Sequence, residues 1–332
     1  MKIAYLGAGS WGFCLSSLLA SKGYDVVCWT TKPKLAAELN ATKKHPLLPA
    51  GPKFDNIKFT TDLAEALEGC DLLVESVTSA GIRPVFEKVK AIGVPHCPII
   101  ITSKGIEQNT GLILPSVVAE VLGEDVLARI GLLSGPSFAH DVVLGLPTSV
   151  VGSAFDYEIM MQICDVFMTK TFRVYPNSDI YGVAYGGALK NIVAIACGIS
   201  DGLGLGPSAR AALIARGLHE MRKLAEARGC QAHTLNGLSG LGDLVLTCSS
   251  PTSRNYSFGY RLGKGETPSE AEKEINMAVE GVYTCLSAWQ LSQSVDVSMP
   301  ITEAVYRIIC GEMQPVDAVR ILMQRTIKEE HL

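Results

Sequence analysis

Residues 2–12, with the sequence KIAYLGAGSWG, constrain the fold of this chain more than any other stretch. The apolar start of this segment predicts a buried strand, and residues 13–20 have the pattern of an amphipathic helix. Between them, Gly7, Gly9 and Gly12 have the G-x-G-x-x-G spacing. In such a loop the first glycine permits a tight turn, the second lets a diphosphate approach the backbone, and the third lets the helix and the strand pack closely. The N–H groups at the start of the helix then face the phosphate. The stretch predicts a dinucleotide-binding loop, with an ordinary strand-to-helix turn as the alternative.

Composition excludes several classes of protein. A chain of 332 residues, 48% of them hydrophobic, can bury a large core and suggests two domains. The net charge of −4 gives no electrostatic footprint for nucleic acid. The first apolar run is too short for a signal peptide, and we expect no stretch of the ~20 apolar residues that a transmembrane segment needs, which predicts a cytoplasmic protein. The ten cysteines form no C-x-x-C pair and lie mostly in apolar stretches, so neither disulfides nor zinc are implied.

The end of the second predicted strand, residues 25–29, bears on the choice of cofactor. In NAD-binding loops an acidic residue at this point grips the ribose 2′-hydroxyl. Here Thr30, Thr31 and Lys32 follow the strand instead. Two hydroxyls and a cation could accept the 2′-phosphate of NADP, so the sequence favours NADP over NAD.

The strand and helix patterns alternate through the first half of the chain. Further strands are predicted over residues 72–74, 98–102, 129–134, 148–152 and 172–175, and helices over residues 33–45, 63–67, 83–91 and 157–168. This alternation predicts an α/β fold with an N-terminal Rossmann-type doubly wound sheet over residues 1–182. Strand-like patterns then disappear, which predicts an all-α C-terminal domain over residues 183–332 that binds substrate and carries out catalysis.

Two lysines stand where a ligand could reach them. Lys104 follows a predicted parallel strand, and ligands of open α/β sheets bind at the carboxyl ends of such strands. Lys190, followed by Asn191, interrupts an otherwise apolar helix, where an unused cation is costly. Gly186 and Gly187 would let another body approach that helix. The alternatives are a surface lysine at 104 and a lysine at 190 that extends to solvent.

The helical half also supplies an acid and an anion site. Asp243 ends the sequence LSGLGD, in a stretch otherwise without charge. Residues 248–256, CSSPTSRNY, combine hydroxyls, a guanidinium and an amide with a predicted helix start, which is typical of phosphate binding, whereas a capping loop is the alternative. Reduction of a carbonyl needs a proton donor, and a buried lysine can supply it. Burial or a nearby Lys104 would lower the pKa of Lys190 from about 10.4, while Asp243 would hold the ammonium in place.

Seven segments carry a resemblance that spans nearly the whole chain: GAGSWG (7–12), SKG (103–105), LSGPSFA (133–139), KN (190–191), GLGD (240–243), SPTSRN (250–255) and VEG (279–281). In this order they resemble the bacterial NAD(P)-dependent sn-glycerol-3-phosphate dehydrogenase family. The resemblance implies reversible conversion of dihydroxyacetone phosphate to sn-glycerol 3-phosphate for phospholipid synthesis, with NADPH or NADH as cofactor, in a homodimer.

The resemblance also implies roles for individual residues, with Lys190 as the catalytic acid/base and no metal. Substrate contacts are implied for Lys104, Gly135, Ser137, Lys190, Asp243, Ser253, Arg254 and Asn255. Cofactor contacts are implied for Gly7, Gly9, Ser10, Trp11, Gly12, Thr31, Lys32, Lys104, Ala139, Arg254, Ala278 and Glu280. Members commonly have arginine where Thr31 stands, so use of both NADP and NAD remains open.

Two other functions compete with this interpretation. A related reductase of the hydroxyacid type also has a lysine on a helix of its helical domain, but it would bind a carboxylate, whereas the hydroxyl-rich residues 250–255 favour phosphate. A nucleotide-sensing module without catalysis could keep the glycine loop. Such a module would need neither Lys190 nor Asp243.

Overall fold

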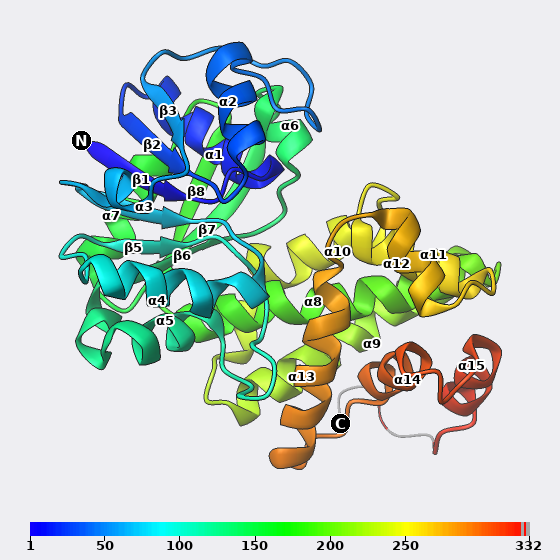
Figure 1. Cartoon of the computed structure of the whole chain (residues 1–332). Helices are drawn as coiled ribbons and strands as arrows, with labels where there is room; N and C mark the ends of the chain where they lie inside the picture. The colour runs from blue at the N-terminus through cyan, green and yellow to red at the C-terminus, as the bar shows by residue number, and fades with distance from the viewer. Residues whose placement is uncertain (327–328, 330–332) are drawn as a thin grey trace.

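An eight-stranded sheet forms the first half of the chain in the computed structural model, which describes residues 1–326 and 329 (Figure 1). Its strands are β1 (Lys2–Leu6), β2 (Asp25–Trp29), β3 (Ile57–Thr60), β4 (Leu72–Glu75), β5 (Ile99–Ile101), β6 (Ile130–Ser134), β7 (Thr148–Ala154) and β8 (Phe172–Asn177). They lie in the order β3-β2-β1-β4-β5-β6-β7-β8. Because β2 and β3 extend to one side of β1 and β4 to the other, the strand order reverses at β1, where doubly wound sheets bind ligands. The predicted fold class is confirmed.

Both faces of the sheet are covered by helices. These are α1 (Ser10–Ser21), α2 (Pro33–Thr42), α3 (Leu63–Leu67), α4 (Ile82–Ile92), α5 (Leu114–Leu122), α6 (Ala139–Val143) and α7 (Tyr157–Phe167), with short 3-10 turns η1 (Ser79–Gly81) and η2 (Glu124–Arg129). In β1, Ile3 and Tyr5 pack with α1, α2 and α7, whereas Ala4 and Leu6 pack with α3, α4 and α5. Burial on both faces explains why this strand is a continuous apolar run.

The structure differs from the predicted pattern in three places. Two of them are elements that the sequence analysis does not predict, β3 and α5. β3 has only four residues, between polar loops. The third difference is the direction of β7, which pairs antiparallel with β6, while β8 is parallel to β7. The connection from β6 to β7 carries only the five-residue α6, which packs on α1, so the chain returns beside the strand that it left.

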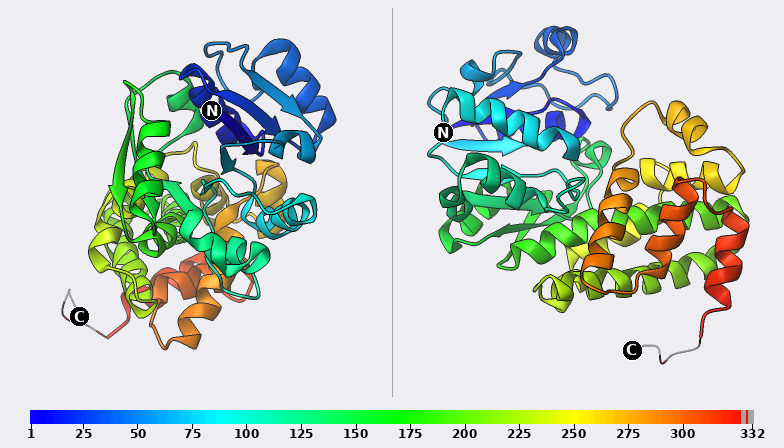
Figure 2. Two further views of the ribbon diagram at one scale, coloured as in Figure 1. Left: turned by 90° about the vertical axis from the view of Figure 1, so that its left-hand side faces the viewer. Right: turned by 60° about the horizontal axis from the view of Figure 1, so that its bottom comes forward.

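The second half of the chain is helical. It comprises α8 (Ile180–Gly202), α9 (Gly206–Ala227), η3 (Ala232–Asn236), η4 (Leu238–Gly242), α10 (Asp243–Cys248), α11 (Arg254–Gly263), α12 (Pro268–Ile275), α13 (Glu280–Ser294), α14 (Pro300–Ile309) and α15 (Pro315–Met323). The right-hand view of Figure 2 shows α8 running from beneath the sheet into the middle of these helices. Its first residues, Ile180 and Val183, belong to the core of the sheet, and its later ones to the core of the helical half.

The length of α8 corrects one expectation from the sequence. With 23 residues it is long and apolar enough to cross a membrane, although we expected no such stretch. In the folded chain 89% of its apolar window is buried. Because α9, α10, α11 and α13 pack around it, this helix has the position of a core helix.

Candidate active site

The loop between β1 and α1 has the tight turn that its glycine spacing predicts. Gly7 has a φ of +107°, and a Cβ there would lie 2.6 Å from the carbonyl oxygen of Ser76. A Cβ on Gly12 would lie 1.9 Å from the carbonyl oxygen of Gly7. These two positions therefore admit only glycine without a shift of the backbone, because helix and strand touch here.

Gly9 lies in a different environment from the other two glycines. Apart from its own atoms and its two chain neighbours, no atom of residues 1–326 or 329 lies within 4 Å of the position that its Cβ would take. It is also the N-cap of α1, and in the part of the chain that the structure describes no side-chain hydrogen bond caps the first turn, which includes Ser10 and Trp11. Open space beside uncapped helix N–H groups fits the diphosphate of a dinucleotide.

Lys104 and Lys190 converge on one carboxylate at the same edge of the sheet. Asp243 accepts from Lys190 Nζ through Oδ1 at 2.5 Å and from Lys104 Nζ through Oδ2 at 2.6 Å. Lys104 Nζ also donates to the carbonyl oxygen of Gly135 at 3.1 Å, and Lys190 Nζ to Thr247 Oγ1 at 2.8 Å. The cluster thus holds two ammonium groups against one carboxylate and keeps one unit of positive charge.

Two of the three charges in this cluster, those of Lys190 and Asp243, are nearly removed from solvent, whereas Lys104 is partly exposed. Lys190 is 7% exposed and Asp243 1% exposed, so the alternative in which Lys190 extends to solvent is wrong. Burial, opposed by Asp243 and assisted by Lys104, lowers the pKa of Lys190 to about 8. Burial opposes ionisation of Asp243 as well, but the two ammonium groups outweigh it and hold the pKa of this carboxyl below its usual value. Lys190 can therefore both hold and release a proton near neutral pH, as general acid–base catalysis requires.

Two glycines of α8 bring the elements of the cluster together. A Cβ on Gly187 would lie 3.3 Å from Cγ of Lys104, and one on Gly186 would lie 2.9 Å from the carbonyl oxygen of Ser239. The close approach expected from these glycines is therefore present. It lets the stem of Lys104 and the turn before Asp243 pack against the helix that carries Lys190.

Hydrogen bonds connect the ends of the strands between the glycine loop and Lys104. The amide of Ser76 donates to the carbonyl oxygen of Leu6, before the loop, and the Ser76 hydroxyl bonds to Thr102 Oγ1 at 2.5 Å. Next to it, Ser103 Oγ donates to Glu75 Oε1 at 2.7 Å. The strand ends of β1, β4 and β5 thus form one connected edge from the glycine loop to Lys104.

Sequence reasoning missed two residues of this region and one contact between residues that it did single out. Thr247 lies four residues after Asp243 on the same helix, a spacing that could have indicated it. Asn191 and Asn255 were both singled out, but the hydrogen bond between them was not predicted. Glu75 is a carboxyl at the end of the apolar strand LLVE, and burial raises its pKa to about 8.

The predicted anion segment lies at the start of α11, where the sequence predicted a helix start. Ser253 is the N-cap and accepts from the amide of Tyr256. The buried Asn255 donates to Asn191 Oδ1 at 2.9 Å and accepts from the amide of Gly281 at 2.8 Å, so it joins α11 to α8 and α13. Arg254 is exposed and donates to the carbonyl oxygen of Ala278 at 2.8 Å.

The remaining predicted residues lie around the same edge. Ser137 Oγ donates to the carbonyl oxygen of Gly135, which Lys104 also contacts, and Ala139 begins α6 beside α1. Glu280 begins α13 and accepts from Ser79 Oγ, in the turn after β4. Thr31 and Lys32 are exposed at the end of β2, whose last residue, Trp29, accepts from the amide of Gly7.

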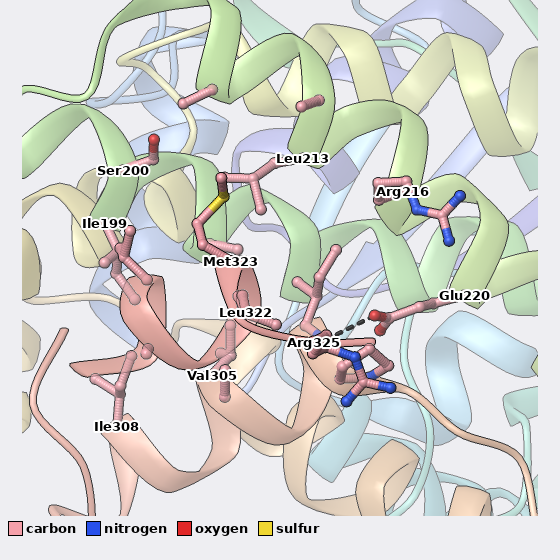
Figure 3. A pocket seen from close by; sticks show the side chains of 18 of the residues that line it. Ile199, Ser200, Leu213, Arg216, Glu220, Val305, Ile308, Leu322, Met323 and Arg325 are labelled. Carbon is pink, nitrogen blue, oxygen red and sulfur yellow. Dashed lines mark hydrogen bonds between the residues drawn. The ribbon is translucent and has the colours of Figure 1, made fainter. Parts of the chain in front are cut away.

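An apolar pocket of about 470 Å³ lies away from this cluster, between α8, α9, α14 and α15 (Figure 3). Leu213, Val305 and Met323 are among the side chains that line it, and Glu220 at its rim accepts from the amide of Ile301 at 2.6 Å. None of the residues predicted for substrate or cofactor lines this pocket.

A glycine loop at the reversal point of a doubly wound sheet, together with a buried lysine on a helical half, defines the class of Rossmann-type dehydrogenases with a helical C-terminal part. Residues 2–160 match the N-terminal part of the NAD-dependent glycerol-3-phosphate dehydrogenase family and residues 179–320 match its C-terminal part. The chain belongs to this family.

Individual relatives agree with this assignment. The chain is 62% identical, over all of its length and 99% of the relative, to glycerol-3-phosphate dehydrogenase [NAD(P)+] of Protochlamydia amoebophila (strain UWE25). The crystal structure of glycerol-3-phosphate dehydrogenase from Coxiella burnetii superposes with a TM-score of 0.92 at 39% identity, covering 98% of this chain and 99% of that one. A D-mandelate dehydrogenase structure, at 13% identity and a TM-score of 0.65 over 96% of this chain and all of that one, shares the fold alone.

Proposed function

We propose that this chain is an NAD(P)-dependent glycerol-3-phosphate dehydrogenase, which interconverts dihydroxyacetone phosphate and sn-glycerol 3-phosphate. The observation that carries the proposal is the buried Lys104–Asp243–Lys190 cluster at the same edge of the sheet as the glycine loop. The family to which the chain belongs supports the choice of substrate. Its product would supply phospholipid synthesis.

The cofactor-binding residues that we propose extend from the glycine loop across the sheet edge. They are Gly7, Gly9, Ser10, Trp11, Gly12, Thr31, Lys32, Lys104, Ala139, Arg254, Ala278 and Glu280. The open space at Gly9 and the uncapped start of α1 support this set. The bound nicotinamide supplies the hydride in reduction and accepts it in oxidation. Thr31 and Lys32 offer a hydroxyl and a cation to a 2′-phosphate, so we expect use of NADPH as well as NADH.

In this proposal Lys190 moves the proton of the reaction. Its Nζ gives a proton to the ketone oxygen during reduction and takes the hydroxyl proton during oxidation. Asp243 and Thr247 fix the position of that ammonium by two hydrogen bonds. The positive charge that remains on the cluster favours an oxygen that becomes negative during the reaction.

The phosphate of the substrate would lie at the start of α11. Ser253 uses its oxygen as an acceptor within the helix cap, which leaves its O–H to donate. Asn255 donates one amide hydrogen to Asn191 and keeps a second. Arg254 adds a guanidinium for a charge-assisted bond. Gly135 and Ser137, next to Lys104, complete the proposed substrate contacts.

The test is the absorbance change of the nicotinamide when purified protein is mixed with dihydroxyacetone phosphate and either NADH or NADPH. We expect oxidation of both cofactors, and the ratio of the rates measures what Thr31 and Lys32 select. A 2-oxo acid serves as the competing substrate. Oxidation with the 2-oxo acid alone would support the carboxylate reductase, and nucleotide binding without any oxidation would support a sensor.

Three further expectations belong to this proposal. We propose that residues 1–182 form the cofactor domain and residues 183–332 the substrate domain; the change of core along α8 supports this division. We also propose a cytoplasmic enzyme.

Finally, we propose a homodimer, supported by exposed apolar side chains such as Val316 and Met323 on α15. Light scattering should give twice the mass of the chain, and a monomer at enzymatic concentrations would contradict the dimer.

A further inference from the structure

Two thiols lie close together at the edge of the sheet opposite to the candidate active site. Cys70 precedes β4 and Cys97 precedes β5, and these neighbouring strands are parallel. Their Sγ atoms are 3.5 Å apart. Because Lys104 follows β5 and Glu75 ends β4, the same two strands separate the thiol pair from the proposed catalytic groups.

The register of the strands places the two backbones at the separation that a disulfide needs. Leu73 lies opposite Ile99, and the amide of Leu73 donates to the carbonyl oxygen of Pro98, so the ladder continues towards the thiols. Counting back along both chains brings Cys97 opposite the residue after Cys70. Ideal strand geometry, with about 4.8 Å between strands and about 3.3 Å per residue, would place the two Cα atoms about 6 Å apart, within the usual range for disulfides.

The pair differs from the other cysteines in its accessibility. Cys70 and Cys97 are partly exposed and line a surface hollow with Gly69 and His96. Seven cysteines are buried, namely Cys14, Cys28, Cys164, Cys197, Cys230, Cys248 and Cys285. Cys310 is exposed. A small oxidant can therefore reach the pair, whereas a buried thiol is shielded from it.

The surroundings of the pair divide its two thiols into a stronger and a weaker acid. The hydrogen bond between the two thiols, with help from the Lys2 ammonium, lowers the pKa of Cys70, against burial and the charge of Asp71. The same hydrogen bond, together with burial, raises the pKa of Cys97, although the charge of Arg129 opposes this. Cys70 is thus the thiol that ionises more readily and can attack an oxidant, and Cys97 is the thiol that can then attack Cys70.

We propose that Cys70 and Cys97 form a redox-active dithiol, which a peroxide oxidises to an intramolecular disulfide. The Cys70 thiolate attacks one oxygen of hydrogen peroxide, the O–O bond breaks, and Cys70 becomes a sulfenic acid while the leaving oxygen takes up a proton as water. The Cys97 sulfur then attacks the Cys70 sulfur, the S–O bond breaks, and a second water leaves. Two thiols lose two electrons and two protons, and a dithiol reductant returns both.

The position of the disulfide determines its effects. It would link the segments before β4 and β5, which are 27 residues apart in the chain. This restricts the unfolded chain, so the Tm of the oxidised protein should rise by roughly 3–6 °C. The rate of the enzyme should change little, because the carboxyl ends of the strands lie at the other edge of the sheet.

The full-length protein is the material for the test. It is treated with graded hydrogen peroxide, its remaining thiols are alkylated, and its peptides are analysed by mass spectrometry. We expect a peptide pair linked through Cys70 and Cys97, lighter by two hydrogens, which disappears on treatment with dithiothreitol. Cys70→Ser and Cys97→Ser should each abolish the linked pair, while the control Cys310→Ser, which removes the exposed thiol, should keep it.

Several outcomes would overturn the proposal. One is oxidation of Cys310 while Cys70 and Cys97 remain alkylatable. Another is a Cys70 that proceeds to sulfinic acid without forming the linked peptide. The Tm of the oxidised and reduced protein is a second readout, and an identical increase in Cys97→Ser would show that the cross-link is not its cause.

Discussion

The glycine loop and the lysine–aspartate cluster lie at the same edge of the sheet but are built in opposite ways. The loop uses the backbone of residues 7–12, which are adjacent in sequence, and its conformation depends on missing side chains. The cluster uses charged side chains from the end of β5, from α8 and from α10. Asp243 lies 53 residues after Lys190 and 139 residues after Lys104.

This difference shows that cofactor binding and proton transfer require different arrangements of residues. A diphosphate needs only N–H groups and space, which a local turn provides. A lysine that exchanges a proton near neutral pH needs burial, an anion and a second cation at defined positions, which one segment cannot supply. Substitutions in the two regions should therefore fail in different ways.

The largest effect should follow from Lys190→Ala. We expect turnover to fall by roughly two to four orders of magnitude, because the proton donor is lost, while cofactor affinity stays nearly unchanged. Steady-state rates and cofactor titration by fluorescence measure the two quantities. The control is Lys88→Ala on the exposed face of α4, which should leave both unaltered. Normal turnover in Lys190→Ala would remove this residue from the mechanism.

Arg254→Ala should have the next largest effect and should act on substrate binding. Loss of a charge-assisted bond to the phosphate predicts a KM for dihydroxyacetone phosphate that is about 10 to 100 times higher, with a smaller change in kcat. Arg173→Ala, an exposed position on β8, is the matched control. If Arg254→Ala keeps the KM of the parent enzyme, the phosphate binds elsewhere.

The two alanine substitutions Gly9→Ala and Gly12→Ala separate the cofactor role of the loop from its structural role. At Gly9 the added Cβ meets none of the described residues beyond its chain neighbours, so we expect an unchanged Tm and a cofactor affinity that falls about tenfold. At Gly12 the Cβ meets the carbonyl oxygen of Gly7, so the free energy of unfolding should fall by about 1–3 kcal/mol in addition. Thermal unfolding and cofactor titration give both numbers. If Gly9→Ala and Gly12→Ala have the same stability, Gly12 has no structural role beyond that of Gly9.

The smallest effect concerns pH. Since the pKa of Lys190 is about 8, the rate of reduction should fall as pH rises through this value, because in the proposed mechanism the lysine loses the proton that it donates. Oxidation should rise over the same range. Asp243 raises the pKa of Lys190, so Asp243→Asn should move the inflection to lower pH, by about one unit or more.

A control is needed for this pH profile because Glu75 titrates in the same range. Burial raises the pKa of Glu75 to about 8. Glu75→Gln should keep the inflection of the parent enzyme. If the inflection disappears in Glu75→Gln, or moves to higher pH in Asp243→Asn, Lys190 is not its source.

Much of the fold followed from local patterns. The strand, glycine loop and helix at residues 2–20 and the alternation after them predicted the doubly wound sheet and the helical half. The sequence did not reveal β3 or the antiparallel direction of β7, because a short strand has little pattern of its own and pairing direction depends on where the chain returns. The length of α8 was also not evident from the sequence, because the polar residues Lys190 and Asn191 interrupt its apolar pattern although both are buried.

The sequence by itself determined which groups are available at the site. Charged residues in apolar surroundings indicated Lys190 and Asp243, and the glycine spacing indicated the cofactor loop. Only the tertiary structure decided that both lysines share one carboxylate, that Thr247 accepts from Lys190 and Asn191 from Asn255, and that Cys70 meets Cys97 at the far edge. The physical reason is that turn conformation and burial are encoded within a few residues, whereas distances between charges and thiols depend on how distant strands and helices pack.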